Sequence, residues 1–258
     1  MRDPIGMSRI YKVAFAFYLI LSFAADAGAA PSVSVLFVGN SLTQANDLPT
    51  VLKRFAAESP LHPEIEIRSI TPGGALFYNH WRNAKAVAML REQHSDFLIL
   101  QGQSTEPLSA SQNFTYYAGL FKAEADRVQT TTVLLSTWAR PANDPYYKDP
   151  TSGGSPAEMQ ARLNTAYASL AMNLTAKLAP VGLAFEYAHR DAPSIELLDG
   201  TQHPSPAGTY LAAAVLLRVL FDSSDISSTY YGGLPKETAL SLQRVASAVP
   251  LTSEPSNN

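Results

Sequence analysis

The sequence predicts a doubly wound α/β sandwich, in which helices cover both faces of a parallel sheet. Short apolar runs rich in β-branched residues alternate with segments of helical periodicity. These runs are almost continuously apolar, which is typical of parallel strands buried on both faces. The chain has 258 residues, of which 46% are hydrophobic and 16% charged, a composition that suits one globular core.

Five runs have the pattern of strands: residues 33–38 (VSVLFV), 64–70 (EIEIRSI), 97–100 (FLIL), 131–135 (TTVLL) and 181–187 (VGLAFEY). Helical spacing relates Leu48, Val51, Leu52, Phe55 and Ala56 after the first run, and Met159, Leu163, Ala166, Leu170 and Leu174 before the fifth. Residues 210–220 are apolar enough for a buried helix, and residues 141–156 predict a long loop. In such folds the site lies beyond the carboxyl ends of the strands, so this loop belongs to the functional end.

The N-terminal segment has the pattern of a secretory signal peptide. Arg2, Arg9 and Lys12 precede the apolar residues 13–25, and Ala27-Gly28-Ala29 precedes the expected cleavage point. An uncleaved anchor is the alternative, but the apolar run is shorter than the roughly 20 residues that span a bilayer. We therefore expect a signal peptide over 1–29, one domain over 30–250, a disordered polar tail over 251–258, and a secreted or periplasmic protein.

Composition excludes several classes of function. The chain has no cysteine, so a disulfide scaffold, a thiolate nucleophile and a cysteine-based metal site are excluded. The net charge of −3 favours neither nucleic acid nor, after signal cleavage, a membrane as a partner. No phosphate-binding glycine loop or HExxH motif is present, and we expect neither a metal nor a cofactor. Nothing in the sequence predicts an oligomeric state.

A serine follows the first predicted strand, in Gly39-Asn40-Ser41-Leu42-Thr43. At such a turn the hydroxyl is exposed at the edge of the sheet, and the serine N–H points toward a developing oxyanion. The alternative is that Ser41 only caps the following helix. A nucleophilic serine needs a base, and histidine is the usual one.

Among the five histidines, which are His62, His80, His94, His189 and His203, the last has the most suitable surroundings. It lies in Leu198-Asp199-Gly200-Thr201-Gln202-His203-Pro204-Ser205, before the apolar helix. A carboxylate four residues earlier can bind the Nδ1 atom of His203 and direct Nε2 toward a serine. The alternative is a solvated loop histidine or a cap.

The Ser41 and His203 segments together resemble the first and last blocks of the GDSL-type (SGNH) serine esterases. This resemblance implies a flavodoxin-like three-layer α/β/α fold with a five-stranded parallel sheet. It also implies a Ser–His–Asp triad that hydrolyses esters through an acyl-enzyme without metal or cofactor, with Ser41 as nucleophile, His203 as base and Asp199 as its carboxylate. The family has three steps from Asp to His and this chain has four, so Glu196 is a weaker alternative to Asp199.

The family's oxyanion hole implies three donors: the N–H of Ser41, the N–H of Gly74, and an amide side chain after the third strand. Here that strand is followed by Gln101-Gly102-Gln103-Ser104, which is similar to the Gln-Gly-Glu-Ser signature of sialate and xylan acetylesterases. Gln101 and Gln103 point the same way in an extended segment, so both are candidates. The alternative is that these glutamines only bind the backbone of the loop. Further likeness over residues 34–248 indicates a little-characterised bacterial branch of secreted SGNH-like proteins.

Aromatic and basic residues at the functional end indicate the substrate. We expect Trp138 and Tyr78 to bind it, within a wider set that also contains Phe77, Trp81, Arg140, Tyr146 and Tyr147. Aromatic side chains with polar neighbours suit sugar rings, although several can be packing residues. The sequence thus predicts an esterase for short, chiefly acetyl, esters on carbohydrate. A polysaccharide O-acetyltransferase and an inactive carbohydrate-binding protein remain the alternatives.

Overall fold

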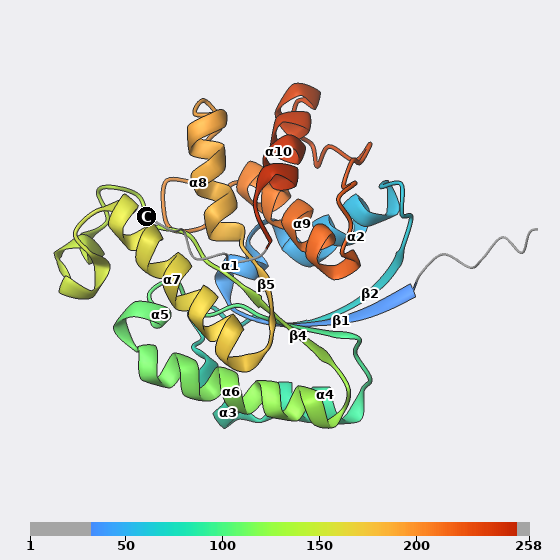
Figure 1. Cartoon of the computed structure of the whole chain (residues 1–258), viewed down its shortest axis with the longest axis vertical. Helices are drawn as coiled ribbons and strands as arrows, with labels where there is room; N and C mark the ends of the chain where they lie inside the picture. The colour runs from blue at the N-terminus through green and yellow to red at the C-terminus, as the bar shows by residue number, and fades with distance from the viewer. Residues whose placement is uncertain (1–31, 252–258) are drawn as a thin grey trace, which may run out of the picture.

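The computed structural model describes residues 32–251 (Figure 1). The signal peptide expected over 1–29 and residues 252–258 of the expected tail lie outside the described residues. Within residues 32–251, no helix combines the length and the apolar character that crossing a membrane requires.

A five-stranded sheet forms the centre of the molecule. Its strands are β1 (Ser32–Val38), β2 (Glu64–Ile70), β3 (Phe97–Leu100), β4 (Thr131–Leu135) and β5 (Lys177–Ala179). All neighbouring pairs are parallel, in the order β2-β1-β3-β4-β5, which is the flavodoxin-like order. The predicted fold class is confirmed.

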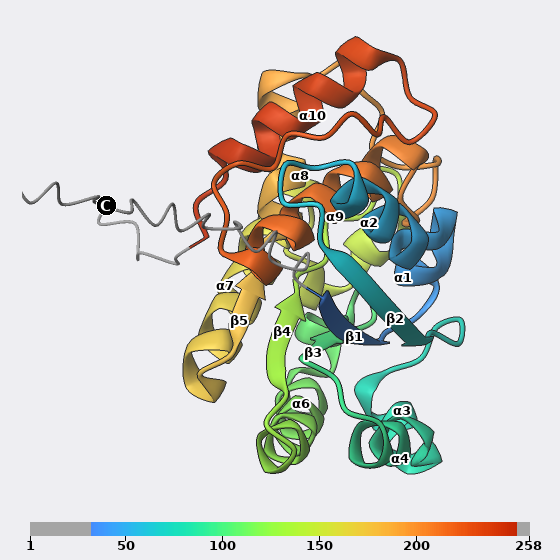
Figure 2. The ribbon, with the colours of Figure 1, turned by 90° about the vertical axis from the view of Figure 1, so that its right-hand side faces the viewer.

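Helices cover both faces of this sheet, as Figure 2 shows from the side. One face carries α2 (Leu48–Ala57), α8 (Val181–Asp191), α9 (Pro206–Phe221) and α10 (Lys236–Ala248). The other carries α3 (Phe77–Asn83), α4 (Lys85–Glu92), α6 (Ser111–Arg127) and α7 (Pro156–Leu174). Successive residues of β1 alternate between the two cores: Val35 and Phe37 pack with the first set, Leu36 and Val38 with the second. This explains why the strand is apolar at every central position.

The prediction of a fifth strand over residues 181–187 is wrong, because this segment is the first part of α8. Its buried residues, Val181, Ala184, Phe185 and Ala188, have helical spacing and pack on the sheet. The true fifth strand, Lys177–Ala179, has only three residues and ends before Pro180, the N-cap of α8. So short a strand leaves little pattern in the sequence.

Short helical segments lie mainly in the loops at the carboxyl ends of the strands. They are α1 (Ser41–Gln44) and the 3₁₀ turn Ala45–Asp47 after β1, α5 (Glu106–Ser109) after β3, and the 3₁₀ turns Pro145–Lys148 and Pro150–Ser152 after β4. The predicted long loop over 141–156 therefore contains two turns of 3₁₀ helix. This end of the sheet brings the sequence-predicted site residues together.

Candidate active site

Ser41 is the first residue of α1, directly after the carboxyl end of β1. The preceding residue, Asn40, is buried and fixes this turn with its side chain. Its Oδ1 accepts the N–H of Leu42 at 3.1 Å, and its Nδ2 donates to the carbonyl of Ala75 at 3.1 Å. The cap on α1 is therefore Asn40, which leaves the Ser41 hydroxyl available for other partners.

The Ser41 hydroxyl faces His203, although the two residues are 162 positions apart in sequence. The distance from Ser41 Oγ to His203 Nε2 is 3.0 Å, which is within hydrogen-bond reach. His203 lies on the loop between α8 and α9, and Asn46 ties this loop to the serine turn. Asn46 Nδ2 donates to the carbonyl of Pro204 at 2.8 Å and to Thr209 Oγ1 at 3.0 Å.

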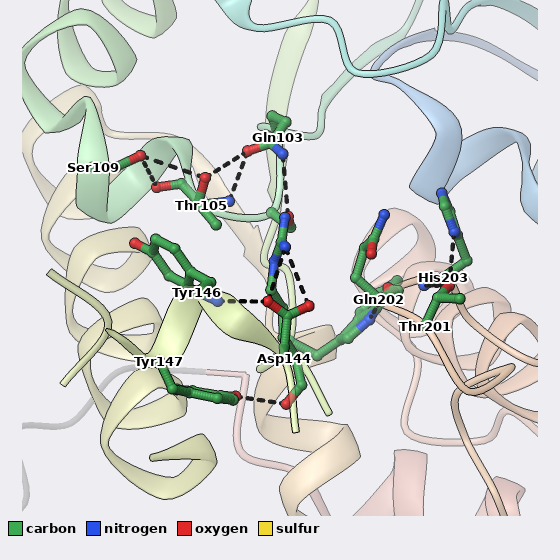
Figure 3. Close-up of polar contacts among 12 residues, drawn as sticks. Gln103, Thr105, Ser109, Asp144, Tyr146, Tyr147, Thr201, Gln202 and His203 are labelled. Carbon is green, nitrogen blue, oxygen red and sulfur yellow. Dashed lines mark hydrogen bonds and ion pairs between the residues drawn. The ribbon is translucent and has the colours of Figure 1, made fainter. Parts of the chain in front are cut away.

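The Asp199 carboxylate makes no direct hydrogen bond to the His203 ring, in contrast to the sequence-based expectation. The group next to His203 Nδ1 is the hydroxyl of Thr201, at 3.0 Å (Figure 3). That hydroxyl also bonds Asp199 Oδ1, at 2.6 Å. The extra residue between aspartate and histidine is what inserts this hydroxyl. Glu196, the alternative acid, makes no side-chain hydrogen bond within residues 32–251; its carbonyl accepts from Ser205.

Two backbone N–H groups in the segments that follow β1 and β2 are candidate oxyanion donors. Within residues 32–251, the N–H groups of Ser41 and Gly74 donate to no other group. Gly74 has a φ of +68°, a left-handed conformation that L side chains rarely adopt. A glycine after β2 therefore allows the chain to turn here with its N–H unpaired.

The Gln101 side chain is buried against the turn that carries Ser41, and its amide is not exposed to a substrate. Its Oε1 accepts the N–H of Asn40 at 3.0 Å and the hydroxyl of Thr43 at 2.9 Å, while its Nε2 donates to the carbonyl of Gly102. Gln101 is 1% exposed. The expectation of an oxyanion donor at Gln101 is corrected: its buried amide braces the backbone that carries Ser41.

Gln103 is half-buried and bonds its own loop. Its Nε2 donates to Ser104 Oγ at 3.2 Å, and its Oε1 accepts the N–H and the hydroxyl of Thr105 at 2.7 and 3.0 Å. One hydrogen of the side-chain amide is thus unassigned, so Gln103 remains the candidate for a third donor.

Glu106 is a buried carboxylate that the sequence interpretation missed. One oxygen accepts the N–H of Phe77 and the other accepts the N–H of Gln103, each at 3.0 Å. Burial raises the pKa of Glu106 to about 7. This carboxylate joins the loop after β2 to the loop after β3, which carry Gly74 and Gln103. Its position three residues after Gln103 has the spacing of a capping box, and that was the available signal.

His80 supports the turn that carries Ser41 through the backbone of Gly39. It is 3% exposed, and its Nε2 lies 2.7 Å from the carbonyl oxygen of Gly39. Burial lowers the pKa of His80, so the ring is neutral and donates from Nε2 to this carbonyl. His80 therefore holds the residue that precedes Asn40 and Ser41.

No protein-family model matches the chain, and no curated protein matches it. Among solved structures, the chain resembles an SGNH hydrolase from Slackia heliotrinireducens with 30% sequence identity and a TM-score of 0.61. The match covers 73% of this chain and 99% of that chain. The chain belongs to the SGNH hydrolase family.

Two further similarities show the fold of this hydrolase. A DUF4886 family protein from Bacteroides uniformis has 17% identity and a TM-score of 0.73, over 84% of this chain and 93% of that chain. An acetylxylan esterase from Geobacillus stearothermophilus has 14% identity and a TM-score of 0.56, over 74% of this chain and 95% of that chain. Both structures share the overall fold of this chain.

The aromatic residues of the hydrolase differ in exposure. Tyr78 is 38% exposed on α3, and its ring lies edge-on to Tyr117 at 5.4 Å. Trp138 is only 3% exposed and stacks on Phe185 with ring centres 4.4 Å apart. Trp138 therefore presents no open ring face, although it lines part of a cavity, and its role in substrate binding stays a prediction.

The loop after β4 lies across from the His203 loop, as the labelled residues Asp144, Tyr147 and His203 show in Figure 3. Arg140 anchors it: Nη1 pairs with Asp144 at 3.2 Å, and Nη2 donates to Ser104 Oγ at 2.8 Å. Tyr147 donates its hydroxyl to the Arg140 carbonyl. Residues of this loop also line a cavity of about 540 Å³. Its lining includes Trp138, Arg140, Phe185, His189, Glu196 and Leu198.

Proposed function

We propose that the protein is a serine esterase that hydrolyses short acyl esters, acetyl foremost, on carbohydrate. The observation that carries this proposal is the 3.0 Å distance between Ser41 Oγ and His203 Nε2. A serine within hydrogen-bond reach of a histidine is the arrangement that activates a hydroxyl as a nucleophile. Membership of the SGNH hydrolase family supports the same chemistry.

In the proposed reaction, Ser41 Oγ forms a bond to the carbonyl carbon of the ester while its proton passes to His203 Nε2. The N–H groups of Ser41 and Gly74 donate to the oxyanion, and Gln103 is the candidate for a third donor. The C–O bond to the alcohol then breaks, and the alcohol leaves with the proton from Nε2. His203 next deprotonates a water molecule, which attacks the acyl-enzyme and releases the acid and Ser41.

An acylated carbohydrate is the proposed class of substrate. A structural neighbour is an acetylxylan esterase, which supports a polysaccharide ester without assigning xylan to this chain. The exposed ring of Tyr78 offers an aromatic surface at the start of α3. Beside the His203 loop, the 540 Å³ cavity combines apolar walls with the polar groups of His189 and Glu196. Such mixed walls suit sugar rings.

We propose a short acyl group because Ser41 lies on a compact turn between β1 and α1. A long acyl chain attached to Ser41 would need an apolar channel that begins at the serine. Turnover of 4-nitrophenyl esters of increasing chain length tests this point, with acetyl expected as the best acyl group. Equal or faster turnover of long-chain esters would contradict it.

Release of acetate from an acetylated oligosaccharide tests the carbohydrate specificity, with Ser41→Ala as the matched inactive control. Faster release than from 4-nitrophenyl acetate at equal concentration is expected. Acetyl transfer to an added glycan instead of water would assign the chain to the acyltransferases, because a sugar hydroxyl can resolve the same acyl-enzyme.

We also propose that the enzyme is exported, from the signal-peptide pattern of residues 1–29. Expression of the full chain should yield a mature protein that begins at about residue 30 in the periplasm or medium. An uncleaved, cell-associated product would contradict export.

A further inference from the structure

Thr201 occupies the position in which the family resemblance places a carboxylate, beside His203 Nδ1. Its Oγ1 lies 3.0 Å from that nitrogen and 3.1 Å from the backbone N–H of His203. The same atom lies 2.6 Å from Asp199 Oδ1, which also accepts the backbone N–H of Thr201 at 2.9 Å. The Asp199 carboxylate is thus linked to the His203 ring only through the Thr201 hydroxyl.

The Thr201 hydroxyl has a single hydrogen, and this determines which of the hydrogen bonds at Oγ1 it donates and which it accepts. Thr201 has one hydroxyl hydrogen, and the ionised Asp199 carboxylate can only accept. The Thr201 hydroxyl hydrogen therefore points to Asp199. Oγ1 then accepts hydrogen bonds from the backbone N–H of His203 and from His203 Nδ1. Nδ1 must then carry the ring hydrogen, so that the lone pair of Nε2 faces the Ser41 hydroxyl.

The Asp199 carboxyl is ionised at neutral pH. The bond from the Thr201 hydroxyl is the largest influence that holds the pKa of Asp199 below its ordinary value. The turn itself is closed by the N–H of Asp199, which donates to the carbonyl of His203 at 3.1 Å. Gly200 takes a φ of +91° within this turn, a conformation suited to glycine. The one-residue insertion thus forms a compact turn that presents Thr201 to the ring.

We propose that Thr201 is a positioning residue for His203 and that Asp199 acts on the histidine through the Thr201 hydroxyl. This inference rests on the proposed function, in which His203 is the base for Ser41. Without the hydroxyl, the neutral ring is free to carry its hydrogen on Nε2, and that tautomer cannot accept the Ser41 proton.

Turnover of 4-nitrophenyl acetate by Thr201→Val and Thr201→Ser tests the proposal. Valine keeps the shape of threonine without the hydroxyl, so kcat should fall about 10- to 100-fold, the range for one hydrogen bond to a charged group. KM should change little, because Thr201 does not touch the ester. Serine restores the hydroxyl and should recover most of the lost kcat. A Thr201→Val enzyme with wild-type kcat would overturn the proposal.

A matched control separates the positioning of His203 by Thr201 from the contribution that an aspartate–hydroxyl turn makes to the fold. Ser227 in the α9–α10 connection bonds Asp225 Oδ1 through its N–H at 3.1 Å and its hydroxyl at 2.8 Å, without a histidine. Ser227→Ala should therefore leave kcat unchanged. Asp199→Ala should reduce kcat, and the double variant Asp199→Ala/Thr201→Val should be no slower than Thr201→Val alone. Additive losses would show that Asp199 acts by another route.

Nitrogen-15 NMR of the imidazole rings reads the tautomer directly, with His203→Gln used to assign the signal. At a pH where the ring is neutral, the hydrogen is expected on Nδ1 in the wild type and predominantly on Nε2 in Thr201→Val. The same tautomer in both proteins would overturn the proposal even if kcat falls. A fluorophosphonate adduct on wild-type Ser41 keeps the two proposals distinguishable: no adduct removes the esterase itself, whereas an adduct with an unchanged tautomer removes only the role of Thr201.

Discussion

Trp138 Nε1 donates a hydrogen bond to the carbonyl oxygen of Gln202, at 3.0 Å. Gln202 immediately precedes His203, so this bond ties the loop after β4 to the loop that carries the histidine. The indole is held by its stack on Phe185, whose ring is nearly parallel to it at 6°. Trp138 thus helps to hold the loop that carries His203, through the residue before the histidine.

Replacing Trp138 with phenylalanine should keep an aromatic stack on Phe185, lose this hydrogen bond and leave a small void where the larger indole was buried. We expect the free energy of unfolding to fall by at least about 1 kcal/mol, the usual worth of the bond alone. The looser loop should lower kcat for 4-nitrophenyl acetate with little change in KM. Kinetics combined with urea denaturation check this prediction, and a rise in KM at constant kcat would instead indicate direct substrate binding by Trp138.

Gln101→Ala should be clearly more destabilising than Gln103→Ala. The first change leaves the buried N–H of Asn40 and the hydroxyl of Thr43 without an acceptor, at a cost of about 1–3 kcal/mol for each group. Gln103 is half-buried, and its partners can turn to water. Urea denaturation of the two variants measures the difference. Equal losses would contradict the bracing role of Gln101.

The pH dependence of stability should include a contribution from Glu106. Burial raises its pKa from 4.5 to about 7, so between these values the native protein holds a proton that the unfolded chain has released. This contribution to the free energy of unfolding is therefore complete below about pH 4.5 and is lost as the pH rises through about 7. Between about pH 4.5 and pH 7, the free energy of unfolding should fall less for Glu106→Gln than for the wild type, as measured by urea denaturation at a series of pH values. Parallel pH profiles for the two proteins would refute the assignment.

The sheet could be predicted from sequence wherever a strand has a continuous apolar core. Residues 64–70, 97–100 and 131–135 are strands in the structure with these bounds. The fifth strand could not be found in this way, because Lys177–Ala179 is too short to show a period. The apolar run that follows it is helical, and its composition alone resembles a buried strand.

The Ser41 and His203 positions were predicted because each lies in a short local motif at a predicted strand end or loop. The contacts around them depend on residues distant in sequence or on side-chain direction. The bond from Trp138 to Gln202 spans 64 residues, and no local pattern indicates that the indole is buried. Likewise, the spacing of Asp199 and His203 showed an extra residue, but only the folded turn shows that the Thr201 hydroxyl fills the space between them.

Fluorophosphonate labelling followed by intact-mass measurement tests the central claim, that Ser41 is a nucleophile activated by His203. The mature wild-type protein should gain one adduct, and Ser41→Ala should gain none. His203→Ala should react at least about 100-fold more slowly than the wild type, since loss of a base typically costs this factor or more. A folded wild-type protein that forms no adduct would contradict the account and favour an inactive carbohydrate-binding protein on the same fold. An equal adduct on Ser41→Ala would contradict it by showing that another residue is the nucleophile.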